Sequence, residues 1–220
     1  MKQTRRQYLA ATGAIAVGTG LAGCLGGGSG PGSTSHSCDL TERESVDELS
    51  QPRLGPADAA VTVEVFEDFA CPHCATFVTG AFSDLKREFA DDDAVAFVHY
   101  DFPIPVSDWS GRVANAARSV QQAAGDEAFF AFSEAAYASQ DDYSWQVVGD
   151  IAEDVGVDPC RVLSDANYTT YESVLQANRQ EGESRGIPGT PAVYVGGQLV
   201  PPNQNRELYG PITSAIESNR

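Results

Sequence analysis

The stretch that decides the fold runs from Val61 to Cys74 and reads VTVEVFEDFACPHC. Val63 and Val65 continue the alternation begun by Val61, and this period of two predicts a strand with one buried face. Residues 94–100 (AVAFVHY) are rich in strand formers and predict a second strand. Between the two, apolar side chains at spacings of roughly three and four predict a helix; they are Phe77, Val78, Phe82, Leu85 and Phe89. Strand, helix and strand form a βαβ unit, whose crossover we expect to be right-handed.

Farther along the chain, residues 109–185 show the apolar spacing of successive helices. Gly125 is expected to end the first of them, because glycine readily adopts the backbone conformation that follows a helix. Ser144 is expected to cap a later helix, and Asp158-Pro159 has the N-cap and first-turn pattern of another. This block therefore predicts a helical insertion after the second strand.

The pattern returns to strand near the end of the chain, where 192–195 and 198–200 flank Gly196-Gly197. Two glycines between short apolar runs predict a hairpin. A terminal helix follows, and Pro211 within it requires a kink or a late start, because proline lacks the N–H of a helix interior. The chain as a whole therefore predicts an α/β fold.

The sequence Cys71-Pro72-His73-Cys74 carries the chemistry, because it follows a strand and opens a helix. The free N–H groups and the dipole of a helix N-terminus favour an anion, so we expect the Cys71 thiol to ionise readily. His73 is expected to add a positive or polarised partner. Because the thiolate is the nucleophile, Cys71 is expected to form a mixed disulfide with a client protein, which Cys74 then resolves. A well-stabilised thiolate favours the reduced form and makes the disulfide a stronger oxidant.

The chain resembles the DsbA-like branch of the thioredoxin superfamily. The resemblance rests on FEDFACPHC at 66–74, on the helical block and on GTPAVYVGG at 189–197, and it spans roughly 55–218. It implies a thioredoxin fold with a helical insertion at about 109–166. That insertion would lie between the N-terminal βαβ unit and a C-terminal ββα unit.

The resemblance also implies roles for single residues. The Thr190-Pro191 bond is expected to be cis and to face the CPHC sequence, so that Pro191 presents the backbone of Thr190 to a client strand. His73, within CPHC, is the mark of an oxidising member of the family. One position departs from the pattern, since the buried acid that family members often carry six residues before the first cysteine is Val65 here. Neither neighbouring glutamate, Glu64 or Glu67, is assigned its role, and the proton acceptor of Cys74 stays open.

The N-terminus has the pattern of an export signal. An arginine pair at Arg5-Arg6 precedes an apolar stretch, Leu9–Ala22, of only 14 residues, which is too short and glycine-rich to be a comfortable membrane span. Residues 1–23 resemble a twin-arginine signal peptide, and Leu21–Cys24 resembles a lipobox, which implies lipidation of Cys24. Residues 24–37 are expected to be a flexible Gly/Ser-rich tether and 38–220 the folded domain. The expected location is the outer face of the cell membrane, with the lipid on Cys24 as anchor.

The charge of the chain is strongly acidic, with 31 acids against 14 bases and a net charge of −17. A surface of this kind disfavours nucleic acid as a partner, because nucleic-acid binding needs clustered Lys and Arg. The composition resembles that of proteins from salt-loving archaea, in which molar salt screens the repulsion between acids. We interpret the acids as solvated surface rather than as a substrate site.

Two further cysteines, Cys38 and Cys160, remain in the expected domain. In an oxidising exterior they could form a structural disulfide, although Cys160, near a helix start, could instead be free and reactive. The pair Cys71/Cys74 with His73 could alternatively bind copper or zinc, but such a site needs another ligand. His36 is interpreted as a linker residue, and His99 as a packed residue of a strand. Trp109 and Trp145 are interpreted as packing residues.

The function expected from the sequence is that of an exported enzyme that oxidises dithiols of extracytoplasmic proteins through a Cys71-Cys74 disulfide. Its expected partners are clients with cysteine pairs and a quinone-linked thiol oxidase or reductase in the membrane; no cofactor and no resident metal are expected. Two alternatives stay open at this point. One is a reductase, isomerase or cytochrome-assembly reductant that uses the same pair, and the other is a copper metallochaperone.

Overall fold

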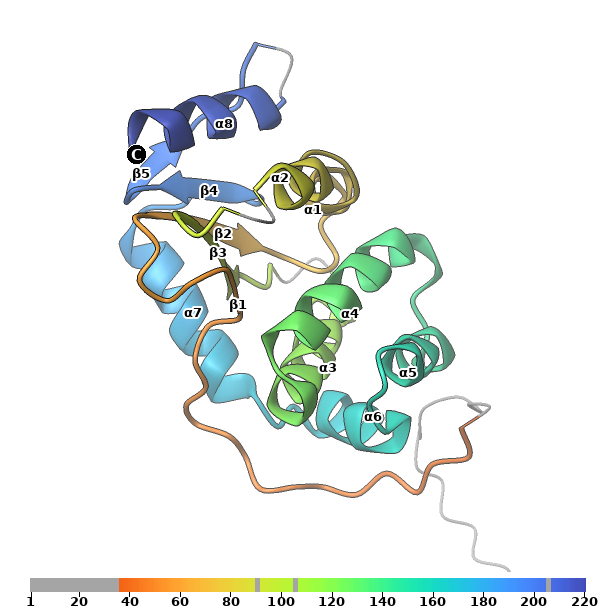
Figure 1. Cartoon of the computed structure of the whole chain (residues 1–220). Helices are drawn as coiled ribbons and strands as arrows, with labels where there is room; N and C mark the ends of the chain where they lie inside the picture. Colours follow the sequence, from red (N-terminus) through yellow and green to blue (C-terminus); the bar gives the residue numbers. More distant parts are fainter. Residues whose placement is uncertain (1–35, 90–91, 105–106, 205–206) are drawn as a thin grey trace, which may run out of the picture. The chain divides into compact units, whose positions relative to one another are not determined.

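The computed structural model describes residues 36–89, 92–104, 107–204 and 207–220 (Figure 1). The expected signal peptide, the lipidation site Cys24 and nearly all of the expected tether lie outside these residues. The chain divides into two units, 1–30 and 31–220, and everything described below belongs to the second.

A five-stranded sheet in the order β1-β3-β2-β4-β5 forms the centre of this unit. The expected βαβ unit is present, because β2 and β3 pair in parallel and the helical segment α1, π-helix and α2 lies between them in the chain. β4 pairs antiparallel with β2, β5 with β4, and β1 with β3. The bounds are β1 Arg53–Leu54, β2 Val61–Glu67, α1 Pro72–Phe77, the π-helix Val78–Phe82, α2 Ser83–Glu88, β3 Val95–Asp101, β4 Ala192–Val195 and β5 Gln198–Val200.

The helical block follows β3, as the sequence predicts. Its helices are α3 Asp108–Ala124, α4 Asp126–Ala138, α5 Trp145–Asp154 and α6 Pro159–Tyr168, and then α7 Glu172–Ser184 and α8 Tyr209–Ser218. The expected caps are confirmed: the Ser144 hydroxyl accepts a hydrogen bond from the backbone of Val147, and the Asp158 carboxylate accepts one from Cys160. Gly125 separates α3 from α4 with a φ of 89°, a conformation that a side chain would disfavour.

Buried apolar side chains form a cluster on each face of the sheet. Helices lie on both of its sides (Figure 1). The larger cluster joins the valines of β2 to α1, α2, α8 and the helical block, with Val61 and Val63 fully buried. The smaller one lies on the other face around Phe66, whose ring stacks on Tyr100 at 4.5 Å. Burial on both faces holds β2 in place, and β2 leads directly into the CPHC sequence.

Two details of the fold were not expected, and a third decides between two expectations. β1 was not expected, because two half-buried residues carry no periodic signal. The helix after Cys74 contains a π-helical stretch, Val78–Phe82, which the spacing of apolar residues does not reveal. Pro211 is the third residue of α8, so the late start is the outcome and the missing N–H falls in the first turn.

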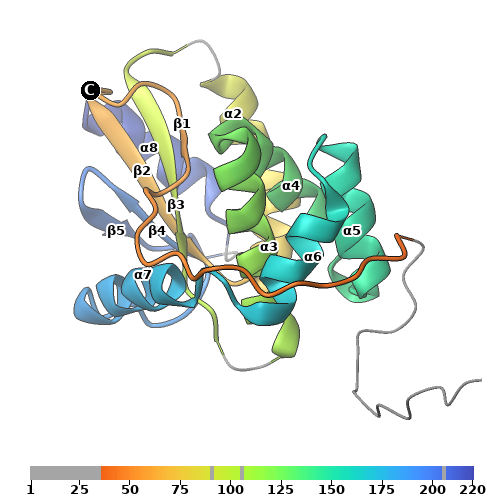
Figure 2. The same ribbon diagram turned by 90° about the horizontal axis from the view of Figure 1, so that it is seen from below.

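Residues 36–52, which we call the N-terminal strap, run in extended form across the helical block to β1 (Figure 2). The strap is attached at several points: Arg43 pairs with Asp165 of α6 at 2.6 Å, and the Val46 amide donates to the Thr170 carbonyl. Ser50 accepts hydrogen bonds from two side chains of α3. In the described part of the chain, no helix combines the length and apolarity that crossing a bilayer requires.

Candidate active site

Cys71 and Cys74 lie where β2 ends and α1 begins, in unequal environments. Cys71 is the N-cap of α1, with 9% of its surface exposed, whereas Cys74 is completely buried one turn later. Both thiols are free in the structure. Pro72 and His73, between them, are exposed. The more accessible thiol is therefore that of Cys71, in agreement with the sequence prediction.

The Cys71 thiol is surrounded by hydrogen-bond donors that favour its ionised form. The hydrogen bond with the Cys74 thiol is the largest of these effects, and it outweighs burial, which alone would raise the pKa. With further hydrogen bonds from the backbone N–H groups of Cys74 and His73, it lowers the pKa of Cys71 to about 5. Burial raises the pKa of the Cys74 thiol well above its usual value. The pair thus combines one thiolate near neutral pH with one protonated thiol. The contribution found for His73 comes from its backbone, and the role of its imidazole stays a prediction.

The peptide bond between Thr190 and Pro191 is cis, as the resemblance implied. The carbonyl oxygen of Thr190 lies 3.4 Å from Cys71 Sγ, so this loop faces the CPHC sequence directly. An adjoining groove of about 1240 Å³ extends from His73 and Pro191 to Tyr209. Leu199 and Tyr209, among its lining residues, are two of the exposed large apolar side chains. The groove therefore adjoins residues that flank the more accessible of the two thiols.

Asp68 fixes the loop that carries Cys71. Its buried carboxylate accepts hydrogen bonds from the amides of Ala70 and Ile104, at 2.7 and 2.6 Å, and from the Ser110 hydroxyl at 3.1 Å. These hydrogen bonds give Asp68 a structural role in the turn before α1. Gln140 adds hydrogen bonds to the carbonyl groups of Phe69 and Cys71. The helical block therefore holds the nucleophile in place.

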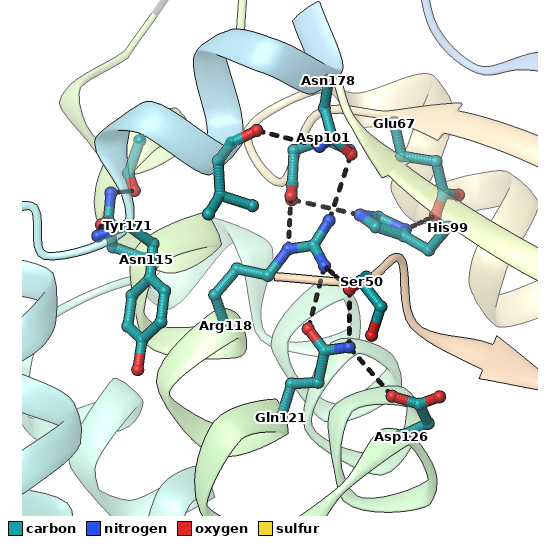
Figure 3. A network of polar contacts seen from close by, with 12 residues as sticks. Ser50, Glu67, His99, Asp101, Asn115, Arg118, Gln121, Asp126, Tyr171 and Asn178 are labelled. Carbon is teal, nitrogen blue, oxygen red and sulfur yellow. Dashed lines mark hydrogen bonds and ion pairs between the residues drawn. The ribbon is translucent and has the colours of Figure 1, made fainter. Parts of the chain in front are cut away.

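Sequence reasoning missed a buried polar network that joins the ends of β2 and β3 to α3 (Figure 3). Glu67 Oε2 lies 3.0 Å from His99 Nδ1, His99 Nε2 lies 3.2 Å from Asp101 Oδ1, and Arg118 Nε donates to Asp101 Oδ2 at 2.7 Å. All four residues are at most 4% exposed. The register of β2 and β3, which sets Val65 opposite His99 and Glu67 opposite Asp101, brings them together.

A signal for Glu67 is nonetheless present in the sequence. The period of two that places Val61, Val63 and Val65 on the buried face of the strand places Glu67 there as well. His99 was interpreted as a packed strand residue. It is buried, but it also bridges two carboxylates, which the sequence of one strand does not reveal.

Known proteins resemble this chain in sequence and in fold. The family model for thioredoxin matches residues 47–213, which is more than half of the chain. The chain belongs to the thioredoxin family.

Among relatives of this thioredoxin-family protein is disulfide bond formation protein D of Bacillus subtilis (strain 168), 25% identical over 173 residues that make up 76% of each chain. The crystal structure of oxidised BdbD from Bacillus subtilis superimposes with a TM-score of 0.68, at 24% identity over 80% of this chain and 98% of that one. The DsbA of Chlamydia trachomatis has the same TM-score, at 18% identity over 81% and 96% of the two chains. The fold is therefore the DsbA-like thioredoxin fold, with its helical insertion.

A further match covers only a part of the relative's length. The Na(+)/H(+) antiporter NhaA 1 of Mycobacterium sp. (strain KMS) is 26% identical over 161 residues, and this alignment covers 72% of the present chain but 25% of the antiporter. The CPHC geometry together with the disulfide-forming relatives makes the thioredoxin-family chain a thiol–disulfide oxidoreductase.

The other sequence-predicted residues lie away from this pair. Cys38 and Cys160 are joined by a disulfide that ties the strap to α6. In the described part of the chain, a group of three residues that could hold a metal consists of His36, Asp150 and Glu153, and it includes neither CPHC cysteine. The Cys/His copper alternative therefore lacks its further ligand among these residues. The tryptophans pack on each other within the insertion, with the Arg112 guanidinium over both rings.

The ionisation of Cys71 gives a direct prediction for this thioredoxin-family protein. Because its pKa is lowered in the folded state, the reduced protein gains stability that is complete above the ordinary thiol pKa and is lost as the pH falls toward about 5. We expect the ultraviolet absorbance of the thiolate to titrate near pH 5 in the reduced protein and to be absent in Cys71→Ser. A midpoint at the ordinary thiol value of about 8.5 would contradict the geometry described here.

Proposed function

We propose that this protein oxidises cysteine pairs of extracytoplasmic proteins, and that Cys71 is the sulfur that the client attacks. A client thiolate attacks Cys71 Sγ of the Cys71–Cys74 disulfide, and the bond between the two enzyme sulfurs breaks. Cys74 leaves with the electron pair and takes up a proton. The second client thiolate then attacks the client sulfur of the mixed disulfide and expels Cys71 as a thiolate. Two electrons have passed from the client to the enzyme.

The observation that carries this proposal is the unequal pair at the N-terminus of α1. The lowered pKa of the Cys71 thiol stabilises the reduced form of the pair relative to the disulfide. A sulfur with a low pKa is also a good leaving group, so Cys71 is released readily from the mixed disulfide. Each of these effects drives electrons from client to enzyme. Buried Cys74 is shielded from clients, so the mixed disulfide forms at Cys71.

The client is proposed to bind along the Thr190-Pro191 loop. An extended client segment would pair with the backbone of Thr190, beside Cys71 Sγ, and rest its apolar side chains in the groove toward Leu199. Pro72 and His73 form the exposed rim of the site on the other side.

Location and recycling complete the proposal. The N-terminal pattern supports export by residues 1–23 and anchoring by a lipid on Cys24 at the outer face of the membrane, with residues 24–37 as tether and 38–220 as catalytic domain. The relatives named for disulfide bond formation support an extracytoplasmic task. A quinone-linked thiol oxidase in the membrane would reoxidise Cys71 and Cys74, and no cofactor is proposed for the domain itself.

The reduction potential of the Cys71–Cys74 pair tests the direction of electron flow. We expect a value near about −120 mV when the purified protein is equilibrated against glutathione in molar salt, because the reduced form is stabilised. A value near about −270 mV would instead give the reductase alternative first place. The variant Cys38→Ser/Cys160→Ser isolates the active pair and serves as the matched control.

A further inference from the structure

Two buried oxygen atoms near Cys74 have no hydrogen-bond partner among the described residues. They are Glu67 Oε1 and the Tyr137 hydroxyl. Both residues are at most 4% exposed. Tyr137 lies in this region because its ring stacks on Phe69, two residues before Cys71, with the ring centres 4.8 Å apart. Buried polar atoms are almost always paired, so two unpaired oxygens at one place call for a functional explanation.

Glu67 and Tyr137 are both coupled electrostatically to the Cys74 thiol. The charge of Glu67 adds to burial in raising the pKa of Cys74, and the charges of Glu67 and Cys74 both raise the pKa of Tyr137. Glu67 therefore presents Oε2 to His99 (Figure 3) and keeps Oε1 buried without a hydrogen-bond partner.

We propose that Glu67 is the group that donates a proton to Cys74 and takes it back, and that His99 is the positioning residue that holds the carboxyl group for this transfer. The inference rests on the proposed thiol–disulfide exchange and adds the route of its second proton. It also assigns the proton acceptor of Cys74, which stayed open because Val65 stands where family members often carry a buried acid.

The proton balance is complete in both directions. During client oxidation, the bond between Cys71 and Cys74 breaks and the departing Cys74 sulfur takes the proton of the Glu67 carboxyl group. During reoxidation, the Glu67 carboxylate takes the proton of the Cys74 thiol. The Cys74 sulfur then attacks Cys71 in the mixed disulfide with the oxidising partner, whose sulfur leaves with the electron pair.

The groups that face Glu67 leave it free to change its charge. From β3, His99 and Asp101 act on it; Cys71 and Cys74 do so at the start of α1, and Tyr137 does so from α4. Asp101 stays ionised, because the Arg118 charge outweighs burial and lowers its pKa to about 2. His99 loses some basicity through burial, but its hydrogen bonds to the carboxylates of Asp101 and Glu67 raise its pKa overall. Burial raises the pKa of Glu67, which moves its titration toward neutral pH.

The test compares Glu67→Gln with Glu64→Gln in single-turnover kinetics across a range of pH. Glu64 is the matched control, because it lies on the same strand but faces away from the thiols and pairs with Arg185. In Glu67→Gln we expect reduction of the oxidised enzyme by a small dithiol, and its reoxidation, to slow about 100-fold, the scale of one acid–base catalyst. One limb of the pH–rate profile should disappear. The thiolate absorbance of Cys71 should still titrate in the acid range, which shows that the nucleophile is intact.

Wild-type rates and an unchanged pH profile in Glu67→Gln would overturn the inference, as would an equal loss in Glu64→Gln. If Glu67→Gln does not fold, Glu67→Asp replaces it. This variant keeps the carboxyl group but shortens its reach, so its rate should fall while the pH limb persists. A wild-type rate in Glu67→Asp would then overturn the inference. The proposed function fails separately, if Cys71→Ser keeps its activity.

Discussion

Cys71→Ser is expected to lose dithiol oxidation by at least about a thousandfold, because a serine hydroxyl neither ionises near neutral pH nor forms a disulfide. The structure assigns the accessible thiolate to Cys71, since Cys74 is completely buried. The measurement is oxidation of a fluorescent peptide with two cysteines, with the enzyme in the disulfide form and in molar salt. The folded state of the variant is checked by its unfolding transition.

Cys74→Ala is the matched variant, because it keeps Cys71 as the nucleophile and removes the sulfur that resolves the mixed disulfide. When the client peptide is supplied in its disulfide form, the Cys71 thiolate attacks it and one client sulfur leaves as a thiolate. The resulting mixed disulfides should accumulate and appear on non-reducing gels, and they should vanish on reduction. Complexes formed by Cys71→Ser through Cys74 would instead show that the buried thiol is reached first. That result would refute the assignment of the two sulfurs.

Cys38→Ala/Cys160→Ala is expected to lower the free energy of unfolding by about 2–5 kcal/mol. The disulfide joins residues 122 positions apart, and closing so long a loop restricts the unfolded chain strongly. It also holds the strap against α6, where Arg43 reaches the buried Asp165. Denaturant unfolding in molar salt measures the change.

The control for this experiment is Cys71→Ser/Cys74→Ser, which removes two cysteines without touching the strap. This double variant should keep most of the wild-type stability under oxidising conditions. The reduction potential of the active pair should stay unchanged in Cys38→Ala/Cys160→Ala, because the two cysteine pairs lie on different elements. Equal unfolding free energies for wild type and Cys38→Ala/Cys160→Ala would contradict a structural role for this disulfide.

Local patterns sufficed for most of the fold. Alternation defined β2, apolar spacing defined the helical block, and the caps at Ser144 and Asp158 fall where they were expected. These features depend on a few neighbouring residues, so a single sequence contains them. β1 and the π-helical stretch Val78–Phe82 depend on pairing and packing with distant residues, and local patterns do not contain that information.

The site divides in the same way. Cys71, Cys74 and the cis bond before Pro191 could be predicted, because a motif or a family resemblance marks each of them. The network of Glu67, His99, Asp101 and Arg118 could not, although each of the first three lies within a predicted strand or at its end. Its formation depends on the register between two strands and on a helix that follows them. Pairing register is a long-range property.

The Cys38–Cys160 bond makes residues 38–160 a closed covalent ring. Only one half of the site lies within this ring. The CPHC sequence belongs to the ring, whereas the Thr190-Pro191 loop belongs to the chain segment that follows Cys160. A single protease cut within the ring therefore opens it without releasing a fragment, whereas a cut between α7 and β4 separates the cysteines from their client loop. Under proteolytic nicking, the vulnerable part of the site is therefore the short linker at 185–191.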